Sequence, residues 1–113
     1  MTTIKIFMQN DKIQSVSAVG HSGYGNYGSD ILCASISAIV QTAGLGIKTL
    51  VSQDVILFTD ENKPEFKITL PDNLSNFQYS QAKLILDTCI LGLKDLQSGY
   101  PKNIKLEVKN DVY

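Results

Sequence analysis

The sequence predicts a single α+β domain over residues 1–113, with five short strands and two long helices in the order ββαββαβ. Short segments of alternating apolar and polar residues form two pairs, each joined by turn-forming residues. Two longer segments repeat apolar residues every three or four positions, which is the helical period. We therefore expect a mainly antiparallel five-stranded sheet packed with two long helices. The pattern leaves the order of the strands across the sheet open.

The first pair of strands is predicted over residues 4–19. Ile4, Ile6 and Met8 occupy alternating positions, and the Asn10-Asp11 pair supplies a turn. Residues 13–19 then return as the second strand. A glycine-rich segment, residues 20–30, separates this hairpin from the first helix.

The first helix is predicted to begin at a cap made by Ser29 or Asp30. Gly44 and Gly46 lie inside it, and each costs about 1 kcal/mol relative to alanine, so they either permit close packing or mark an early end. The apolar stripe that we expect to be buried consists of Leu32, Ile36, Ile39, Ala43, Ile47 and Leu50.

The second half of the chain repeats the pattern of hairpin and helix. Residues 55–59 and 65–70 form the second hairpin around the turn sequence DENKP, and residues 103–109 form the last strand. Ser75 can cap the second helix, which Gly99 and Pro101 end. Its expected buried stripe consists of Phe77, Ala82, Ile85, Leu86, Cys89, Leu93 and Leu96.

Composition limits the classes of function. The net charge of -1 gives no general attraction to nucleic acid or to an anionic membrane. We find no run of 18 apolar residues and no signal-peptide pattern at the N-terminus, so we expect a cytoplasmic protein without membrane contact. In that reducing compartment Cys33 and Cys89 are expected to be free thiols, and Cys89, inside an apolar run, is expected to pack in the core.

The stretch GHSGYGNYGSDILC, residues 20–33, carries the chemistry. Cys33 falls in the first turn of the predicted helix, where free backbone N–H groups and the helix dipole favour a thiolate. His21 is the only histidine, and folding of the loop could bring it over the helix start to act as a general base. The same N–H groups could stabilise an oxyanion. Asp30 could orient His21, although a helix cap is the more ordinary role for it.

Other site chemistries fit the residues less well. The loop lacks the lysine of a P-loop and the strand-GxGxxG-helix unit of a dinucleotide site, so a phosphate cradle is not favoured. One histidine and two distant cysteines do not make a usual zinc site, and we expect no metal and no cofactor. Serine hydrolase chemistry is not supported either, because Ser22, Ser35 and Ser37 are not in a G-x-S-x-G turn and the sequence has only one histidine to serve them. Tyr24 and Tyr27 could cover a pocket, contact an apolar substrate, or simply be exposed turn residues.

At these positions the chain resembles the bacterial ribosomal-processing cysteine protease family, also called Prp or YsxB-like. The resemblance rests on Gly20-His21-Ser22, Tyr24, Gly28, the segment Asp30–Ala34 and Ser37, and the order of elements matches over the whole chain. It implies that His21 is the general base, that Cys33 is the nucleophile, and that Asp30 and Ser37 support them. It also implies a mobile loop that covers the substrate, formed by Gly20, Ser22, Gly23, Tyr24, Gly25, Tyr27 and Gly28.

The resemblance further implies a substrate and an assembly state. The family removes a short N-terminal extension from a large-subunit ribosomal protein, cutting after an apolar segment that contains phenylalanine. The resemblance also implies a homodimer. Leu32 and Ser35 depart mildly from the family pattern, and neither position carries a reacting group. The alternative function is a non-catalytic ribosome-associated module whose loop grips a peptide or RNA; the weak net charge argues against RNA as its main ligand.

Overall fold

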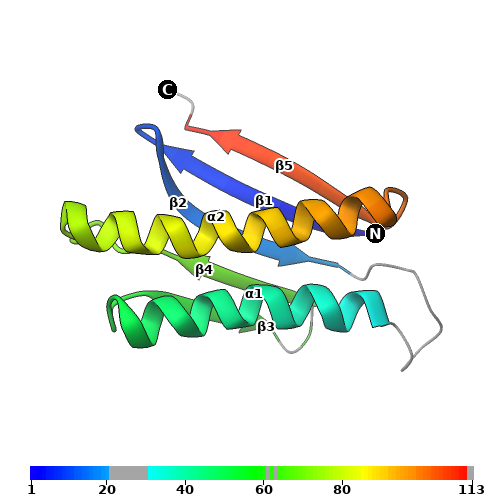
Figure 1. The fold of residues 1–113 in the computed structure, drawn as a ribbon, viewed down its shortest axis with the longest axis horizontal. Coiled ribbons are helices and arrows are strands. Elements are labelled where there is room, and N and C mark those ends of the chain that lie inside the picture. Colours follow the sequence, from blue (N-terminus) through cyan, green and yellow to red (C-terminus); the bar gives the residue numbers. More distant parts are fainter. Residues whose placement is uncertain (21–30, 61, 63, 112–113) are drawn as a thin grey trace.

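The computed structural model describes residues 1–20, 31–60, 62 and 64–111. Its elements follow the predicted order: β1 (Thr2–Gln9), β2 (Lys12–Val19), α1 (Ile31–Leu50), β3 (Ile56–Asp60), β4 (Glu65–Thr69), α2 (Asn76–Gly99) and β5 (Ile104–Asn110). The strands form a five-stranded sheet, and both helices lie on one face of it (Figure 1). The predicted α+β class and its ββαββαβ order are confirmed.

The sheet has the strand order β3-β4-β2-β1-β5. β1 pairs with β2, β2 with β4, and β3 with β4, all antiparallel, whereas β5 joins β1 in parallel. The Asn10-Asp11 turn of the first hairpin is confirmed, with φ angles of 53° and 62° that suit asparagine and aspartate. The sheet is therefore mixed and mostly antiparallel, with the last strand of the chain beside the first.

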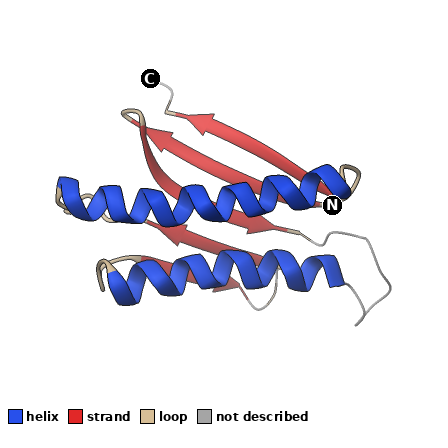
Figure 2. Ribbon diagram, in the orientation of Figure 1, coloured by secondary structure: helices blue, strands red, loops and turns tan. Residues whose placement is uncertain are grey.

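The core lies between the helices and the sheet, which form the two layers seen in Figure 2. Ile4 and Val16 from the sheet, Val40 from α1, and Leu86 and Leu93 from α2 are all fully buried. Alternate strand positions and the helical stripe thus point at each other, as the two periodicities predict.

For two residues of the predicted stripes, the expected burial is wrong. Leu50 is 77% exposed and Phe77 is 71% exposed. Burial continues from Ile47 to the partly buried Val51, directly after α1, and the buried face of α2 includes Tyr79 near its start. At both helix ends the apolar residue that reaches the core is set by the packing around it.

Helix α1 is also long and apolar enough to cross a membrane, judged by length and composition alone. Its buried residues Leu32, Ile36, Val40 and Ile47 belong to the core cluster. The core helix of a soluble protein passes the same test, and packing against the sheet accounts for the apolar composition here.

Candidate active site

Cys33 is the third residue of α1 and is half-buried. Its predicted place in the first helical turn is confirmed. The backbone N–H groups of a first turn have no partner within their own helix, so an anion beside them is stabilised. The position suits a thiol that must carry negative charge during a reaction.

Cys33 opens on a cavity of about 210 Å³. The cavity lies between the start of α1, the end of β2 and the β3–β4 hairpin, and Ile36, Val40 and Phe66 give it apolar walls. Its other lining residues are Thr2, Ala18, Gly20, Ser37, Gln41, Thr59, Asp60, Pro64 and Glu65. A cavity with apolar walls and a thiol at its edge can hold an apolar side chain beside a nucleophile.

Three of the lining residues form one row along α1. Cys33, Ser37 and Gln41 are spaced by four residues, so they share a face of the helix. The Gln41 amide nitrogen Nε2 donates a hydrogen bond to Ser37 Oγ at 2.7 Å. Our sequence analysis named Cys33 and Ser37 and missed Gln41, although the spacing of four from Ser37 was a signal that could have found it.

Gly20 anchors the end of β2 beside the cavity. Its N–H donates to the Pro64 carbonyl at 2.7 Å, and its own carbonyl accepts from Thr2 Oγ1 at 3.3 Å. Its φ of 95° disfavours other residues, and a Cβ there would stand 2.7 Å from the Met1 carbonyl oxygen. The glycine is required at this point, where the chain leaves the sheet toward His21.

The remaining predicted site residues lie outside the described residues: His21, Ser22, Gly23, Tyr24, Gly25, Tyr27, Gly28 and Asp30. Their proposed roles therefore stay predictions. Among the predicted residues that the structure does describe, Gly20, Cys33 and Ser37 come together around one cavity.

Cys89, the second thiol, is in a different environment. It is buried in α2 with 6% of its surface exposed, which confirms its predicted packing role. Burial raises the pKa of the Cys89 thiol to about 11. It stays neutral at physiological pH and is unsuited to nucleophilic work.

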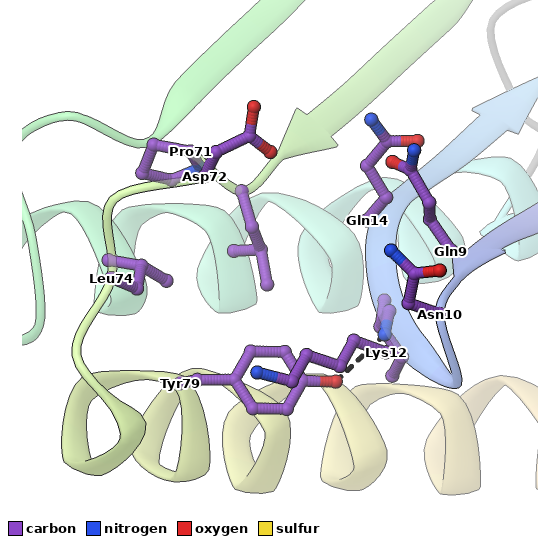
Figure 3. Close-up of a pocket in the computed structure, with 10 residues that line it drawn as sticks. Gln9, Asn10, Lys12, Gln14, Pro71, Asp72, Leu74 and Tyr79 are labelled. Atoms are coloured by element: carbon purple, nitrogen blue, oxygen red, sulfur yellow. Dashed lines mark hydrogen bonds between the residues drawn. The ribbon is translucent and has the colours of Figure 1, made fainter.

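A second cavity, of about 420 Å³, has no thiol among its lining residues. Figure 3 shows side chains of the β1–β2 hairpin, such as Asn10 and Gln14, facing Asp72 across it. The Tyr79 hydroxyl accepts a hydrogen bond from the Ile13 N–H at 2.8 Å, and the Lys12 ammonium lies 5.0 Å from the Tyr79 ring centroid. These contacts join the hairpin to α2, and no cysteine, serine or histidine is among the lining residues of this cavity.

Comparison with known proteins decides the family. The sequence profile of the family described as cysteine protease Prp matches residues 1–105. The chain belongs to the Prp family of cysteine proteases. The Prp ribosomal processing cysteine protease of Staphylococcus aureus is 32% identical over 110 residues, which cover 96% of this chain and all of that protein. The Prp of Bacillus subtilis is 25% identical over 107 residues, covering 94% of this chain and 96% of that protein.

Solved structures agree with this membership. A crystal structure of the essential S. aureus Prp with a covalently linked product peptide has a TM-score of 0.83 and 33% identity, covering 96% of this chain and all of that one. Another, of S. aureus Prp with a substrate peptide, has a TM-score of 0.79 and 29% identity, with the same coverage. A Streptococcus mutans protein at 24% identity and a TM-score of 0.80, covering 98% of this chain and 96% of that one, shows the same fold.

Proposed function

We propose that this Prp-family protease removes the short N-terminal extension of a large-subunit ribosomal protein, cutting after an apolar segment that contains phenylalanine. The observation that carries the proposal is Cys33, half-buried in the first turn of α1 and opening on a cavity with apolar walls. The Prp relatives of S. aureus and B. subtilis, which cover 96% and 94% of this chain, are ribosomal processing proteases, and the S. aureus protein has been crystallised with a substrate peptide.

The proposed mechanism is acyl transfer through a Cys33-His21 dyad. His21 takes the proton of the Cys33 thiol, and the thiolate attacks the carbonyl carbon of the scissile peptide bond. N–H groups of the first turn of α1 stabilise the resulting oxyanion. His21 then protonates the leaving amine as the C–N bond breaks, which leaves an acyl-enzyme thioester at Cys33. Attack by water releases the acid and restores the thiol, while Asp30 and Ser37 support the dyad.

The glycine-rich loop supplies the proposed substrate cover. We assign this role to Gly20, Ser22, Gly23, Tyr24, Gly25, Tyr27 and Gly28. Gly20, held by Thr2 and Pro64, gives the loop a fixed origin beside the cavity. A loop that closes over an extended peptide would exclude water and complete the site.

The decisive test is cleavage of a peptide that spans the extension junction. We expect the wild-type protein and its Cys89→Ala variant to cut the peptide, and Cys33→Ala to leave it intact, because only Cys33 opens on the cavity. Mass spectrometry of the products measures both the rate and the cut position. Equal cleavage by wild type and Cys33→Ala, or no cleavage by either, would contradict the proposal.

We also propose that the protein is a homodimer joined through the outer face of its two helices. A groove of about 770 Å³ runs between α1 and α2 there, and no charged residue is among its lining residues. Small or apolar residues such as Ala38, Gly46 and Gly92 line it, and Leu84 and Leu50 at its rim are 69% and 77% exposed. An uncharged apolar groove with projecting leucines is complementary to a second copy of itself, as a two-fold interface requires.

We also propose that the protease acts in the cytoplasm. No disulfide joins Cys33 and Cys89. A reduced nucleophile such as Cys33 persists most readily in a reducing compartment, where a newly made ribosomal protein would also be met.

A further inference from the structure

We infer that Gln41 is a positioning residue for Cys33: its amide holds Ser37 Oγ so that the Ser37 hydroxyl proton points into the Cys33 cavity. The inference rests on the proposed protease function, in which Ser37 supports the nucleophile. It adds a residue that lies outside the family motif used to recognise the site.

The geometry places the three residues in sequence along one cavity. Gln41, Ser37 and Cys33 occupy successive turns of α1 and all line the same space. The Nε2–Oγ distance of 2.7 Å is that of a short, well-formed hydrogen bond. Residues four apart on a helix have Cβ atoms about 5–6 Å apart, so Ser37 and Cys33 are neighbours on one face of α1.

The direction of this hydrogen bond matters because a serine hydroxyl has a single proton. Helical serines can donate that proton to a backbone carbonyl one turn earlier. Ser35 does so to the Ile31 carbonyl at 2.9 Å, Ser80 to Phe77 at 2.7 Å and Ser98 to Asp95 at 2.7 Å.

Ser37 differs from these serines. Among the contacts between described residues, Ser37 Oγ accepts from Gln41 and makes no bond to a backbone carbonyl. Its proton is thereby left for an acceptor in the cavity, and the Cys33 thiolate is the anion that the reaction places there. Hydrogen bonds to charged acceptors are the stronger class.

The test compares Ser37→Ala, Gln41→Ala and the double variant with wild type. We expect each single variant to lower the rate of Cys33 alkylation by iodoacetamide at neutral pH by about 3- to 10-fold, since the thiolate loses an oriented donor. The double variant should be no slower than Ser37→Ala alone, because Gln41 acts through Ser37. Effects that multiply would overturn the inference, as would unchanged rates.

Glutamate at position 41 tests the direction of the bond. An ionised carboxylate only accepts, so in Gln41→Glu the Ser37 proton would turn toward the carboxylate and away from the cavity. We expect Gln41→Glu to be as slow as Gln41→Ala from pH 6 to 8. A wild-type rate in Gln41→Glu would show that Ser37 donates to Gln41 and would overturn the inference.

Ser35→Ala is the matched control, since this serine lies on the same helix and bonds the backbone. It should alkylate at the wild-type rate, and Gln41→Ala should keep a thermal unfolding midpoint close to that of wild type, because Gln41 is exposed. The readout needs no substrate. If alkylation follows these expectations and the junction peptide is not cut by wild type, the proposed function fails while the role of Gln41 stands.

Discussion

At the scale of single residues, the two cysteines show how position decides chemistry. Cys33 is half-buried at a helix start and opens on a cavity, whereas Cys89 is buried among apolar neighbours and its pKa is raised to about 11. The sequence predicted the place of Cys33 in the first helical turn and the burial of Cys89, because a helical period and an apolar run are local features. Gln41 was not predicted: its spacing of four from Ser37 indicates a shared helix face, but the cavity that this face lines is formed by the tertiary structure.

Burial of Cys89 predicts a pH dependence of stability. Its folded pKa of about 11 lies above the ordinary 9.0, so the folded protein keeps this proton when the unfolded chain has lost it. The free energy of unfolding should therefore fall as pH rises from about 9 through about 11. Urea unfolding of wild type and Cys89→Ala at several pH values separates the effect of this thiol from that of the lysines, which titrate in the same pH range.

In that comparison Cys89→Ala should lose less stability across this pH range than wild type. Parallel curves for wild type and Cys89→Ala would contradict the assignment of the slope to Cys89.

At the scale of elements, α1 shows why two glycines in one helix have different roles. A Cβ at Gly44 would lie 2.9 Å from Leu57 Cδ2 and 3.2 Å from Ile68 Cγ1, while a Cβ at Gly46 meets nothing within 4 Å. Gly44 therefore lets α1 approach the sheet closely. The sequence left close packing and an early helix end as alternatives, and the helix continues to Leu50.

Alanine substitutions at the two positions should change the free energy of unfolding in opposite directions. Gly46→Ala should raise the free energy of unfolding by about 0.5–1 kcal/mol, through helix propensity alone. Gly44→Ala has the same propensity gain but must displace Leu57 and the fully buried Ile68, so it should be less stable than Gly46→Ala by about 1–3 kcal/mol. Urea unfolding at several protein concentrations checks this and separates folding from association. Equal gains at both positions would contradict the close packing of Gly44.

Local signals predicted the elements well and long-range pairing poorly. Ser75 caps α2 in a full capping box with Gln78, as a sequence of this kind indicates. The parallel pairing of β5 with β1 joins residues about a hundred positions apart, and no local pattern encodes it. Leu50 and Phe77 were misplaced for a related reason: at a helix end, tertiary contacts decide which of two neighbouring apolar residues is buried.

At the scale of the whole molecule, the two faces of the helical layer differ in what covers them within this chain. The inner face packs on the sheet and contributes the core, while the outer face keeps an apolar groove and exposed leucines. Cys33 lies at the start of α1, beside the sheet rather than on this outer face. A partner could therefore cover the groove and leave the proposed active site open.

The proposed homodimer predicts different effects from charge on the two surfaces. Leu84→Glu places a carboxylate in the groove and should raise the dimer dissociation constant by at least about tenfold, because a buried unpaired charge is costly. Ile56→Glu is the matched control: Ile56 is 59% exposed on the edge strand β3, away from the groove, and this variant should associate like wild type. Sedimentation equilibrium over a range of concentrations measures both. A wild-type protein that stays monomeric, or two variants that associate equally, would exclude the helical face as the interface.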